Sequence, residues 1–314
     1  MNNQLLHTMY ILNKNELRVF KSVCDGHVSA AALIEDTGLS NISIYRIIQS
    51  LSSKKLVTSR RDGKINIIFI SSHGHSKALA TYLEGNSRAI EPLIGSRLLA
   101  MLSASSNQKT LGRIATETRL APESVRRIVW ALKGFAAVAQ DGDVISIPQS
   151  DKILTRFLQD FSRGACAAVL DDITSAGRIL WCEGLQFIFA SRELKDTSGI
   201  RSTGVTAMSQ RGLQFISDTK YYHYAYWRPS LKPEDIALHN ILIDPSSSRG
   251  IAYSLLFLFK SGYRSGYLRR QGDAMGVGEL SELMIKYLDG ENVENLLFPS
   301  RSDMQELRIQ YGVK

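Results

Sequence analysis

Apolar residues recur at helical spacing in one early segment of the chain. Ile44, Ile47, Ile48 and Leu51 lie three or four positions apart, and residues with that spacing share one face of a helix. The positions between them are polar, so only one face is suited to a core. The pattern predicts an amphipathic helix over residues 41–54.

Two shorter helices are predicted before it. Leu17, Phe20 and Val23 have helical spacing within residues 15–24. Ser29 is a typical N-cap and Gly38 is typical of a helix end, which together predict a second helix over residues 30–37. The chain therefore begins with three short helices.

A hairpin is predicted after the third helix. A strand begins at Leu56-Val57, and residues 65–70 form an apolar return strand. Between them, Arg60 to Lys64 is predicted to be a basic turn, because its Asp-Gly pair is a strong hairpin signal. Three helices followed by a basic hairpin are the expected layout of residues 1–75.

The segment from Gly38 to Leu51 returns as the segment from Arg119 to Leu132. Ser43 corresponds to Ser124 and Arg46 to Arg127, a constant offset of 81 positions. In the second copy, helices are predicted over 92–103, after a Thr110 cap, and over 124–133. Strands are predicted over 136–140 and 144–147, around an acidic Asp-Gly-Asp turn where the first copy has a basic one.

The remaining chain has a different character. Residues 76–84 predict a linking helix. From residue 149 onward the patterns mix, with strands expected over 179–190 and 221–227, and helices over 151–163, 249–260, 264–275, 277–288 and 302–311. Residues 236–244 fit either a strand or a helix. We predict a multidomain α+β protein with domains 1–75, 92–148 and 149–314 and a linker over 76–91.

The charge is concentrated in the half that carries the repeat. The chain has a net charge of +8, and residues 1–150 hold 18 Lys and Arg against 11 Asp and Glu. A basic surface of this kind favours a polyanionic partner, because Lys and Arg that neutralise phosphates release condensed counterions. A solvated surface with a basic bias is the alternative that charge alone leaves open.

Cysteine usage and hydropathy indicate a cytoplasmic protein. Cys24, Cys166 and Cys182 are widely spaced and form no CxxC pair, which fits a reducing compartment. Residues 1–12 do not have the pattern of a signal peptide. The most apolar stretch, residues 251–259, is far shorter than the roughly 20 residues that span a bilayer. We expect no membrane association.

The third helix of each copy carries the candidate DNA contacts. In a helix-turn-helix this helix lies in the major groove, where Asn and Gln pair with adenine and Arg pairs with guanine. The hairpin arginines and lysine suit phosphates or the minor groove. The candidates are Ser40, Asn41, Ser43, Tyr45, Arg46, Gln49, Arg60, Arg61 and Lys64 in the first copy, and Ser124, Arg126, Arg127 and Lys133 in the second.

The N-terminal half resembles the winged helix-turn-helix superfamily of bacterial and archaeal transcription regulators. The resemblance lies in the pattern Leu39-Ser40-x-x-Ser43-Ile44-Tyr45-Arg46-x-Ile48-x-x-Leu51-x-x-Lys54-x-Leu56-Val57. It implies two winged helix-turn-helix domains followed by a mixed α/β domain. The unequal hairpin charges indicate that the first copy makes most of the DNA contact, and that the second is an auxiliary reader or a surface turned towards another subunit or domain.

The C-terminal half resembles the AbiEi-type antitoxins of toxin–antitoxin systems. The resemblance rests on three short segments, residues 203–213, 243–252 and 297–313. It implies a repressor of its own operon that also neutralises a nucleotidyltransferase toxin. Double-stranded DNA, such a toxin and a second copy of the chain are the expected partners.

The chain carries none of the usual catalytic motifs. GxxxxGK[ST], GxSxG, HExxH and a dinucleotide fingerprint are all missing from the sequence, so we expect neither enzyme activity nor a cofactor. His73-Gly74-His75 lacks further ligands for a metal and is predicted to be a surface turn. The aromatic run at residues 221–227 fits either base stacking or an ordinary strand.

Other functions remain compatible with the repeat. A plasmid or viral replication initiator also carries two winged helices, and binds tandem direct repeats. An interaction module without DNA contact and a nuclease with a degenerate acidic site are further alternatives. The leading prediction is a DNA-binding transcription repressor.

Overall fold

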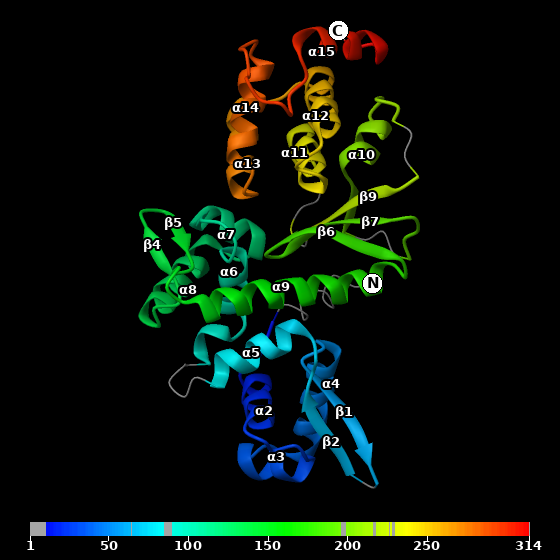
Figure 1. The fold of residues 1–314 in the computed structure, drawn as a ribbon. Helices are drawn as coiled ribbons and strands as arrows, with labels where there is room; N and C mark the ends of the chain where they lie inside the picture. The colour runs from blue at the N-terminus through cyan, green and yellow to red at the C-terminus, as the bar shows by residue number, and fades with distance from the viewer. Residues whose placement is uncertain are drawn as a thin grey trace. The chain divides into compact units, whose positions relative to one another are not determined.

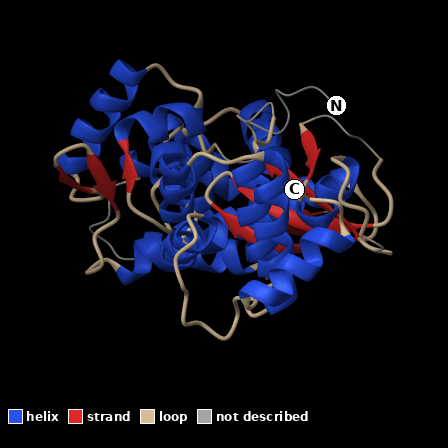
Figure 2. Ribbon diagram, turned by 90° about the horizontal axis from the view of Figure 1, so that it is seen from above, coloured by secondary structure: helices blue, strands red, loops and turns tan. Residues whose placement is uncertain are grey.

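A computed structural model describes residues 11–63, 65–84, 90–195, 199–215, 218–225, 227 and 230–313. The chain divides into two compact units. The first runs to Asp171 and includes Glu183–Leu185, and the second comprises Asp172–Cys182 and the chain from Gln186 onward. Both are mixed α and β, and Figure 2 shows small groups of strands bordered by helices. No helix of the described residues is long and apolar enough to cross a bilayer.

The first unit opens with three helices and a hairpin. These are α2 (Lys14–Cys24), α3 (Ala30–Thr37), α4 (Asn41–Ser53), β1 (Val57–Asp62) and β2 (Ile65–Ile70). The two strands are antiparallel, with Val57 opposite Ile70. Figure 1 shows α2, α3 and α4 gathered beside this hairpin. The three predicted helices are confirmed within one residue of their expected bounds, and the predicted hairpin is confirmed with a shorter turn than expected.

Local capping explains why these bounds could be predicted. Ser29 accepts a hydrogen bond from the Ala32 amide at 3.2 Å, which satisfies a backbone donor at the start of α3. Gly38 ends the helix in the left-handed conformation, with φ of 68°, which glycine adopts without steric cost.

The second set of elements also has three helices and a hairpin, with a short strand added between its first two helices. After α5 (Gly74–Glu84) and a 3₁₀ turn (Glu91–Leu93) come α6 (Ser96–Ser103), β3 (Lys109–Thr110), α7 (Leu111–Thr118), α8 (Pro122–Gly134), β4 (Ala139–Asp141) and β5 (Val144–Ser146). The strands form an antiparallel sheet in the order β3-β5-β4. The predicted continuous helix over 92–103 is wrong. Ile94 is extended because it bridges to Leu12, and Gly95 breaks the helix with φ of 59°.

The offset of 81 positions extends to the core, so we call residues 11–70 the first repeat and residues 92–147 the second. Five matched pairs supply the centre of each core, and every member is at most 1% exposed. The pairs are Leu17 with Leu98, Phe20 with Met101, Leu33 with Ile114, Ile44 with Val125, and Leu51 with Leu132. Since α2–α4 and α6–α8 bury the same positions, the repeat is a structural one.

A long helix, α9 (Lys152–Ile173), follows the second repeat. It was expected to end before Gly164, but it continues through that glycine. A close packing contact accounts for a glycine inside the helix, because a Cβ at Gly164 would lie 2.2 Å from Nδ1 of His75. His75 lies in α5 and is 3% exposed, so the predicted surface turn is wrong at His75, whereas His73 is exposed at a bend before the helix.

The second unit combines a four-stranded sheet with helices. The strands β6 (Gly177–Glu183), β7 (Gln186–Ser191), β8 (Ile200–Ser202) and β9 (Lys220–Ala225) have the order β6-β7-β9-β8. The single strand expected over 179–190 is two strands, because Gly184 turns the chain with φ of 56°. The helices are α10 (Gly204–Gln210), α11 (Pro233–Ile243), α12 (Ser248–Ser261), α13 (Ser265–Ala274), α14 (Gly278–Leu288) and α15 (Arg301–Gln310).

Candidate nucleic-acid interface

The exposed face of α4 is polar at the positions expected to contact DNA. Asn41, Tyr45, Arg46 and Gln49 are exposed, whereas Ile44 and Ile47 on the opposite face are buried. Tyr45 has 63% of its surface exposed. Arg46 forms no hydrogen bond or ion pair with the other described residues, so its guanidinium is available to a ligand. The structure thus brings four of the predicted contacts together on one side of one helix.

Two predicted contacts in the first repeat also serve the helix itself. Ser40 is the N-cap of α4 and accepts a hydrogen bond from the Ser43 amide at 3.3 Å. The two hydroxyl oxygens lie 2.9 Å apart. Because the Ser40 hydroxyl caps the helix and the Ser43 hydroxyl is hydrogen-bonded to it, a base contact by either one would have to share hydrogen-bonding capacity with these local contacts.

One exposed residue of α4 was missed by the sequence prediction. Ile42 has 67% of its surface exposed, at the beginning of the helix between Asn41 and Ser43. A β-branched apolar side chain at that position can contact the methyl group of thymine. The signal was present in the sequence, since Ile42 lies off the buried stripe formed by Ile44, Ile47 and Leu51.

The hairpin arginines lie on a strand rather than in a turn. Arg60 pairs with Ile67, and Arg61 with Asn66, in the β1–β2 ladder. The predicted basic turn over 60–64 is therefore shorter than expected, because the ladder continues to Asp62. Both arginine side chains are exposed. Lys64 lies outside the described residues.

In the second repeat, the matching face carries internally paired charges. The Glu123 carboxylate lies 3.3 Å from Arg126 and 3.6 Å from Arg127. Ser124 is exposed. Lys133, which is also exposed, donates a hydrogen bond to Gln140 at 3.3 Å. Each candidate of the second repeat therefore lies on the surface of α8, but a carboxylate reduces the positive charge around the two arginines.

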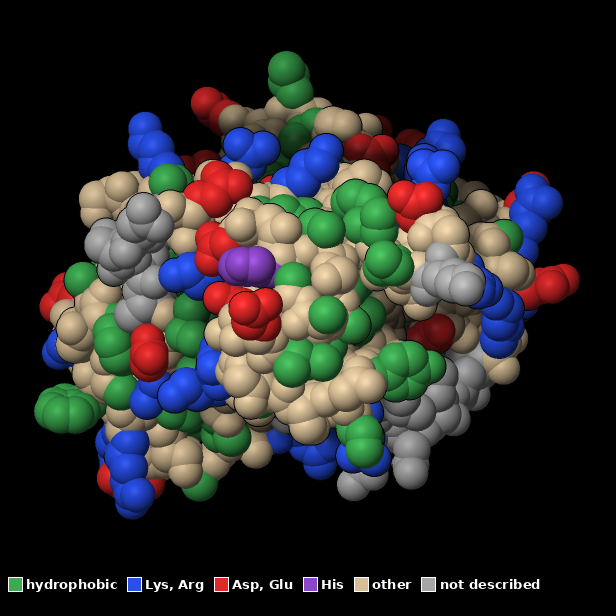
Figure 3. All heavy atoms as spheres, turned by 90° about the horizontal axis from the view of Figure 1, so that it is seen from below, with side chains coloured by type: hydrophobic (Ala, Val, Ile, Leu, Met, Phe, Trp, Pro, Cys, Tyr) green, Lys and Arg blue, Asp and Glu red, His purple; other side chains and the backbone are tan. Residues whose placement is uncertain are grey.

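The space-filling view from below shows how basic side chains are distributed (Figure 3). On this face Lys and Arg side chains are interspersed with acidic, apolar and polar groups. Basic side chains on this face are therefore mixed with acidic ones.

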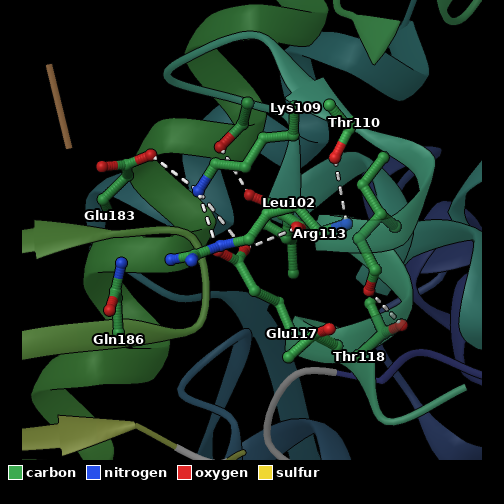
Figure 4. Close-up of polar contacts among 12 residues, drawn as sticks. Leu102, Lys109, Thr110, Arg113, Glu117, Thr118, Glu183 and Gln186 are labelled. Carbon is green, nitrogen blue, oxygen red and sulfur yellow. Dashed lines mark hydrogen bonds and ion pairs between the residues drawn. The ribbon is translucent and has the colours of Figure 1, made fainter. Parts of the chain in front are cut away.

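A buried ionic cluster in the first unit joins the second repeat to Glu183. The Lys109 ammonium is 3.1 Å from Glu117 and 3.0 Å from Glu183, and all three side chains are at most 3% exposed. Figure 4 shows this ammonium between the two carboxylates, with Arg113 directed at Glu117. Ser103 donates a further hydrogen bond to Glu117 at 2.6 Å.

The two carboxyl groups of this cluster have opposite pKa shifts. Burial alone would raise the pKa of Glu117, but Lys109, Arg113 and the Ser103 hydroxyl outweigh it, so the pKa is lowered. Burial raises the pKa of Glu183 above its usual range, and Lys109 only partly offsets that. Because the cluster is closed to solvent, it offers no access to a substrate, and removal of one partner would leave a buried charge unpaired.

Among the described residues of the second unit, the aromatic residues of β9 and His239 form no exposed site comparable to the one on α4. The aromatic residues of β9 pack internally, with Tyr224 at 5.1 Å from Phe187 and Tyr222 at 5.4 Å from Phe189, measured between ring centroids. This favours the strand interpretation of residues 221–225 over base stacking, and Tyr226 of the predicted run lies outside the described residues. His239 accepts or donates a hydrogen bond with Thr203 at 2.8 Å in the interior. No group of His, Cys, Asp and Glu in the part of the chain that the structure describes could hold a metal ion.

Comparison with known proteins gives one match. A family model described as HVO_2833_C, C-terminal matches residues 197–313, which is most of the second unit. No curated protein and no solved structure matches the chain. The chain is therefore similar to that family over its C-terminal part only.

Proposed function

We propose that this protein is a DNA-binding transcription regulator whose first repeat is a winged helix that contacts duplex DNA. The observation that carries the proposal is the exposed face of α4. It presents Asn41, Tyr45, Arg46 and Gln49 together, which are side chains that can pair with base edges and phosphates in a major groove.

The hairpin and the net charge support the same function. Arg60 and Arg61 are exposed on β1, immediately after α4 in the chain. The helix would enter the major groove and supply sequence specificity. The flanking basic hairpin would contact the DNA backbone and supply affinity. The proposal does not require a DNA contact by Ser124, Arg126, Arg127 or Lys133 of α8, where Glu123 pairs with both arginines.

The experiment is a salt titration of DNA binding with three variants. Arg46→Ala should weaken binding by about 1–3 kcal/mol and relax one base preference. Arg60→Ala should weaken binding to all sequences and flatten the slope of log K against log salt by about one unit. Arg270→Ala, an exposed arginine of α13, is the control and should change neither. Unchanged DNA binding in both Arg46→Ala and Arg60→Ala would show that the first repeat is not the DNA-contacting unit.

The antitoxin form of this proposal adds a protein partner. It would regulate its own operon and neutralise a nucleotidyltransferase toxin, as the resemblance of its C-terminal half implies. A nucleotidyltransferase gene beside this one, together with inhibition of its product by this protein, would support that form.

A replication initiator is the second candidate, because the repeat places two similar units in tandem. The operator distinguishes the two functions. An inverted repeat over the gene's own promoter would favour a regulator, whereas several direct repeats protected in a footprint would favour an initiator.

A further inference from the structure

The outer face of α8 carries an unusual combination of side chains. An exposed stripe runs along the helix, and its members are Glu123, Arg126, Arg127, Trp130 and Lys133. Trp130 has 79% of its surface in solvent. Large aromatic residues and arginines are enriched at protein–protein interfaces and often dominate their energetics.

A groove lies beside this stripe. It has a volume of about 710 Å³, and Leu111, Val129 and Ala131 contribute to its lining together with Trp130. A protruding tryptophan can insert into a pocket of a partner, and the apolar groove beside it can accept an apolar side chain of that partner. This favours an apolar partner surface rather than a solvated one.

The charge of this face is balanced, which disfavours a polyanion. Glu123 is paired with both arginines, and the adjacent hairpin carries Asp141 and Asp143, which are exposed. The matching positions of α4 carry no acidic residue: Ile42 stands where α8 has Glu123. The helix α8 therefore presents both signs of charge where α4 presents Arg46 and no acidic residue, whereas each hairpin carries an exposed aspartate, Asp62 in the first repeat and Asp143 in the second.

The order of these side chains is self-complementary. Consider two α8 helices that lie antiparallel about a two-fold axis midway between Arg126 and Trp130. Each residue of one helix then lies opposite the partner residue that is the same number of positions from the axis in the other direction. Trp130 then lies opposite the partner's Arg126, and Lys133 lies opposite the partner's Glu123. The first pair is a cation–π contact and the second is an ion pair. Both pairs occur twice, as two-fold symmetry requires.

We propose that α8 binds α8 of a second copy of this chain and forms a two-fold symmetric dimer. The occupant of the face is a second copy because the stripe supplies, in reversed order, both members of each contact. This goes beyond the proposed DNA binding and does not depend on it, since α4 of the first repeat takes no part in the pairing.

The first experiment measures self-association of the full-length protein by sedimentation velocity over a concentration series. The wild-type chain should form dimers. Trp130→Ala should raise the dimer dissociation constant at least tenfold, which corresponds to about 1.4 kcal/mol. Gln49→Ala changes the matched position of the first repeat, and should leave the dissociation constant unchanged. Thermal unfolding of each variant shows whether it remains folded.

The second experiment exchanges the charges. Glu123→Lys and Lys133→Glu should each weaken self-association, because each places like charges opposite one another. An equimolar mixture of the two variant chains should associate again, since a lysine of one chain then faces a glutamate of the other at both ionic contacts. A structural defect in either chain would not be rescued by mixing.

Three results would overturn the proposal. They are a monomeric wild-type chain at all concentrations, a dimer whose stability is unchanged by Trp130→Ala, and charge variants that fail to associate when mixed. If Trp130→Ala lowered DNA affinity while the chain stayed monomeric, α8 would be a DNA-contacting helix and the dimer assignment would be wrong.

Discussion

Lys55 and Ala136 share a left-handed backbone conformation, with φ of 55° and 54°, and lie 81 positions apart. In both repeats the following residue returns to the third helix: the Leu56 amide donates to the Leu51 carbonyl at 2.9 Å, and the Ala137 amide to the Leu132 carbonyl at 3.0 Å. Leu56 and Ala137 are buried. In each repeat, the left-handed residue allows the next residue to be buried and to donate a hydrogen bond to the end of the third helix. These two contacts keep Lys55 and Ala136 in a conformation that non-glycine residues rarely adopt.

Glycine at position 136 should therefore stabilise the protein. A left-handed conformation costs a non-glycine residue about 1–2 kcal/mol, and the greater backbone entropy of glycine in the unfolded chain offsets about 0.5–1 kcal/mol of that gain. Ala136→Gly should raise the free energy of unfolding by up to about 1 kcal/mol. Ala131→Gly, within α8, is the control and should lower it by about 1 kcal/mol. Urea unfolding measures both.

Parts of the fold were predictable because their signals are local. The bounds of α3 follow from Ser29 and Gly38, which act on their own helix ends through local contacts. In contrast, α11 could not be distinguished from a strand, because residues 234–242 are all buried and a helix buried on every side has no amphipathic pattern. The breaks at Gly95 and Gly184 depend on glycine conformations that the apolar pattern around them does not reveal.

The candidate interface was predictable to a similar degree. The exposed positions of α4 follow from its apolar stripe, so Asn41, Arg46 and Gln49 were placed correctly on the surface. The pairing of Glu123 with Arg126 and Arg127 could be predicted, because residues three and four positions apart are neighbours on a helix. The Lys109–Glu183 contact joins residues 74 positions apart. It could not be predicted from the sequence, because periodic patterns report only on residues of the same helix or strand.

The buried cluster should give two opposite pH dependences of stability. Glu117 has a lowered pKa in the folded state, so its contribution is present above the unfolded value of 4.5 and is lost as the pH falls through the folded value. Glu183 has a raised pKa, so its contribution is complete below 4.5 and is lost as the pH rises through the folded value.

Glutamine variants would separate these two contributions. Relative to wild type, Glu117→Gln should be least stable near neutral pH, and its deficit should shrink as the pH falls below about 4.5. The stability of Glu183→Gln relative to wild type should improve as the pH rises above about 4.5. Urea unfolding across a pH series measures both, and Glu35→Gln is an exposed control. Parallel profiles for the two buried variants would contradict the assigned directions.

Gly164 should be intolerant of alanine although it lies inside a helix. The added Cβ would lie 2.2 Å from Nδ1 of His75, and His75 is held in place by a 2.9 Å hydrogen bond between Nε2 and the Lys54 carbonyl. Gly164→Ala should cost about 1–3 kcal/mol by overpacking. Gly112 of α7 has no atom within 4 Å of its Cβ position, so Gly112→Ala should be neutral or stabilising by up to about 1 kcal/mol.

The clash with His75 can be tested by a double-mutant cycle. If the cost of Gly164→Ala arises at the imidazole ring, the same substitution in a His75→Ala background should cost much less. Additive effects, measured by urea unfolding, would show that the cost arises elsewhere.

The first repeat has a buried ion pair of its own, between Lys54 and Glu16. The Lys54 ammonium lies 2.5 Å from the Glu16 carboxylate, and the two side chains are 6% and 2% exposed. Burial lowers the pKa of Lys54, and Glu16 only partly restores it. Lys54→Met would leave the Glu16 charge buried without its cation, which should cost about 3–5 kcal/mol.

Glu16→Gln should recover part of that loss when it is added to Lys54→Met. The amide removes the unpaired charge, and its oxygen can still accept the hydrogen bond that the Asn13 amide donates to Glu16 at 2.7 Å. Lys14→Met, on the exposed side of α2, should change the free energy of unfolding by no more than about 0.5 kcal/mol. If the double variant is no more stable than Lys54→Met alone, the penalty comes from the lost packing of the lysine and its hydrogen bond to the Ile11 carbonyl, and not from the uncompensated carboxylate.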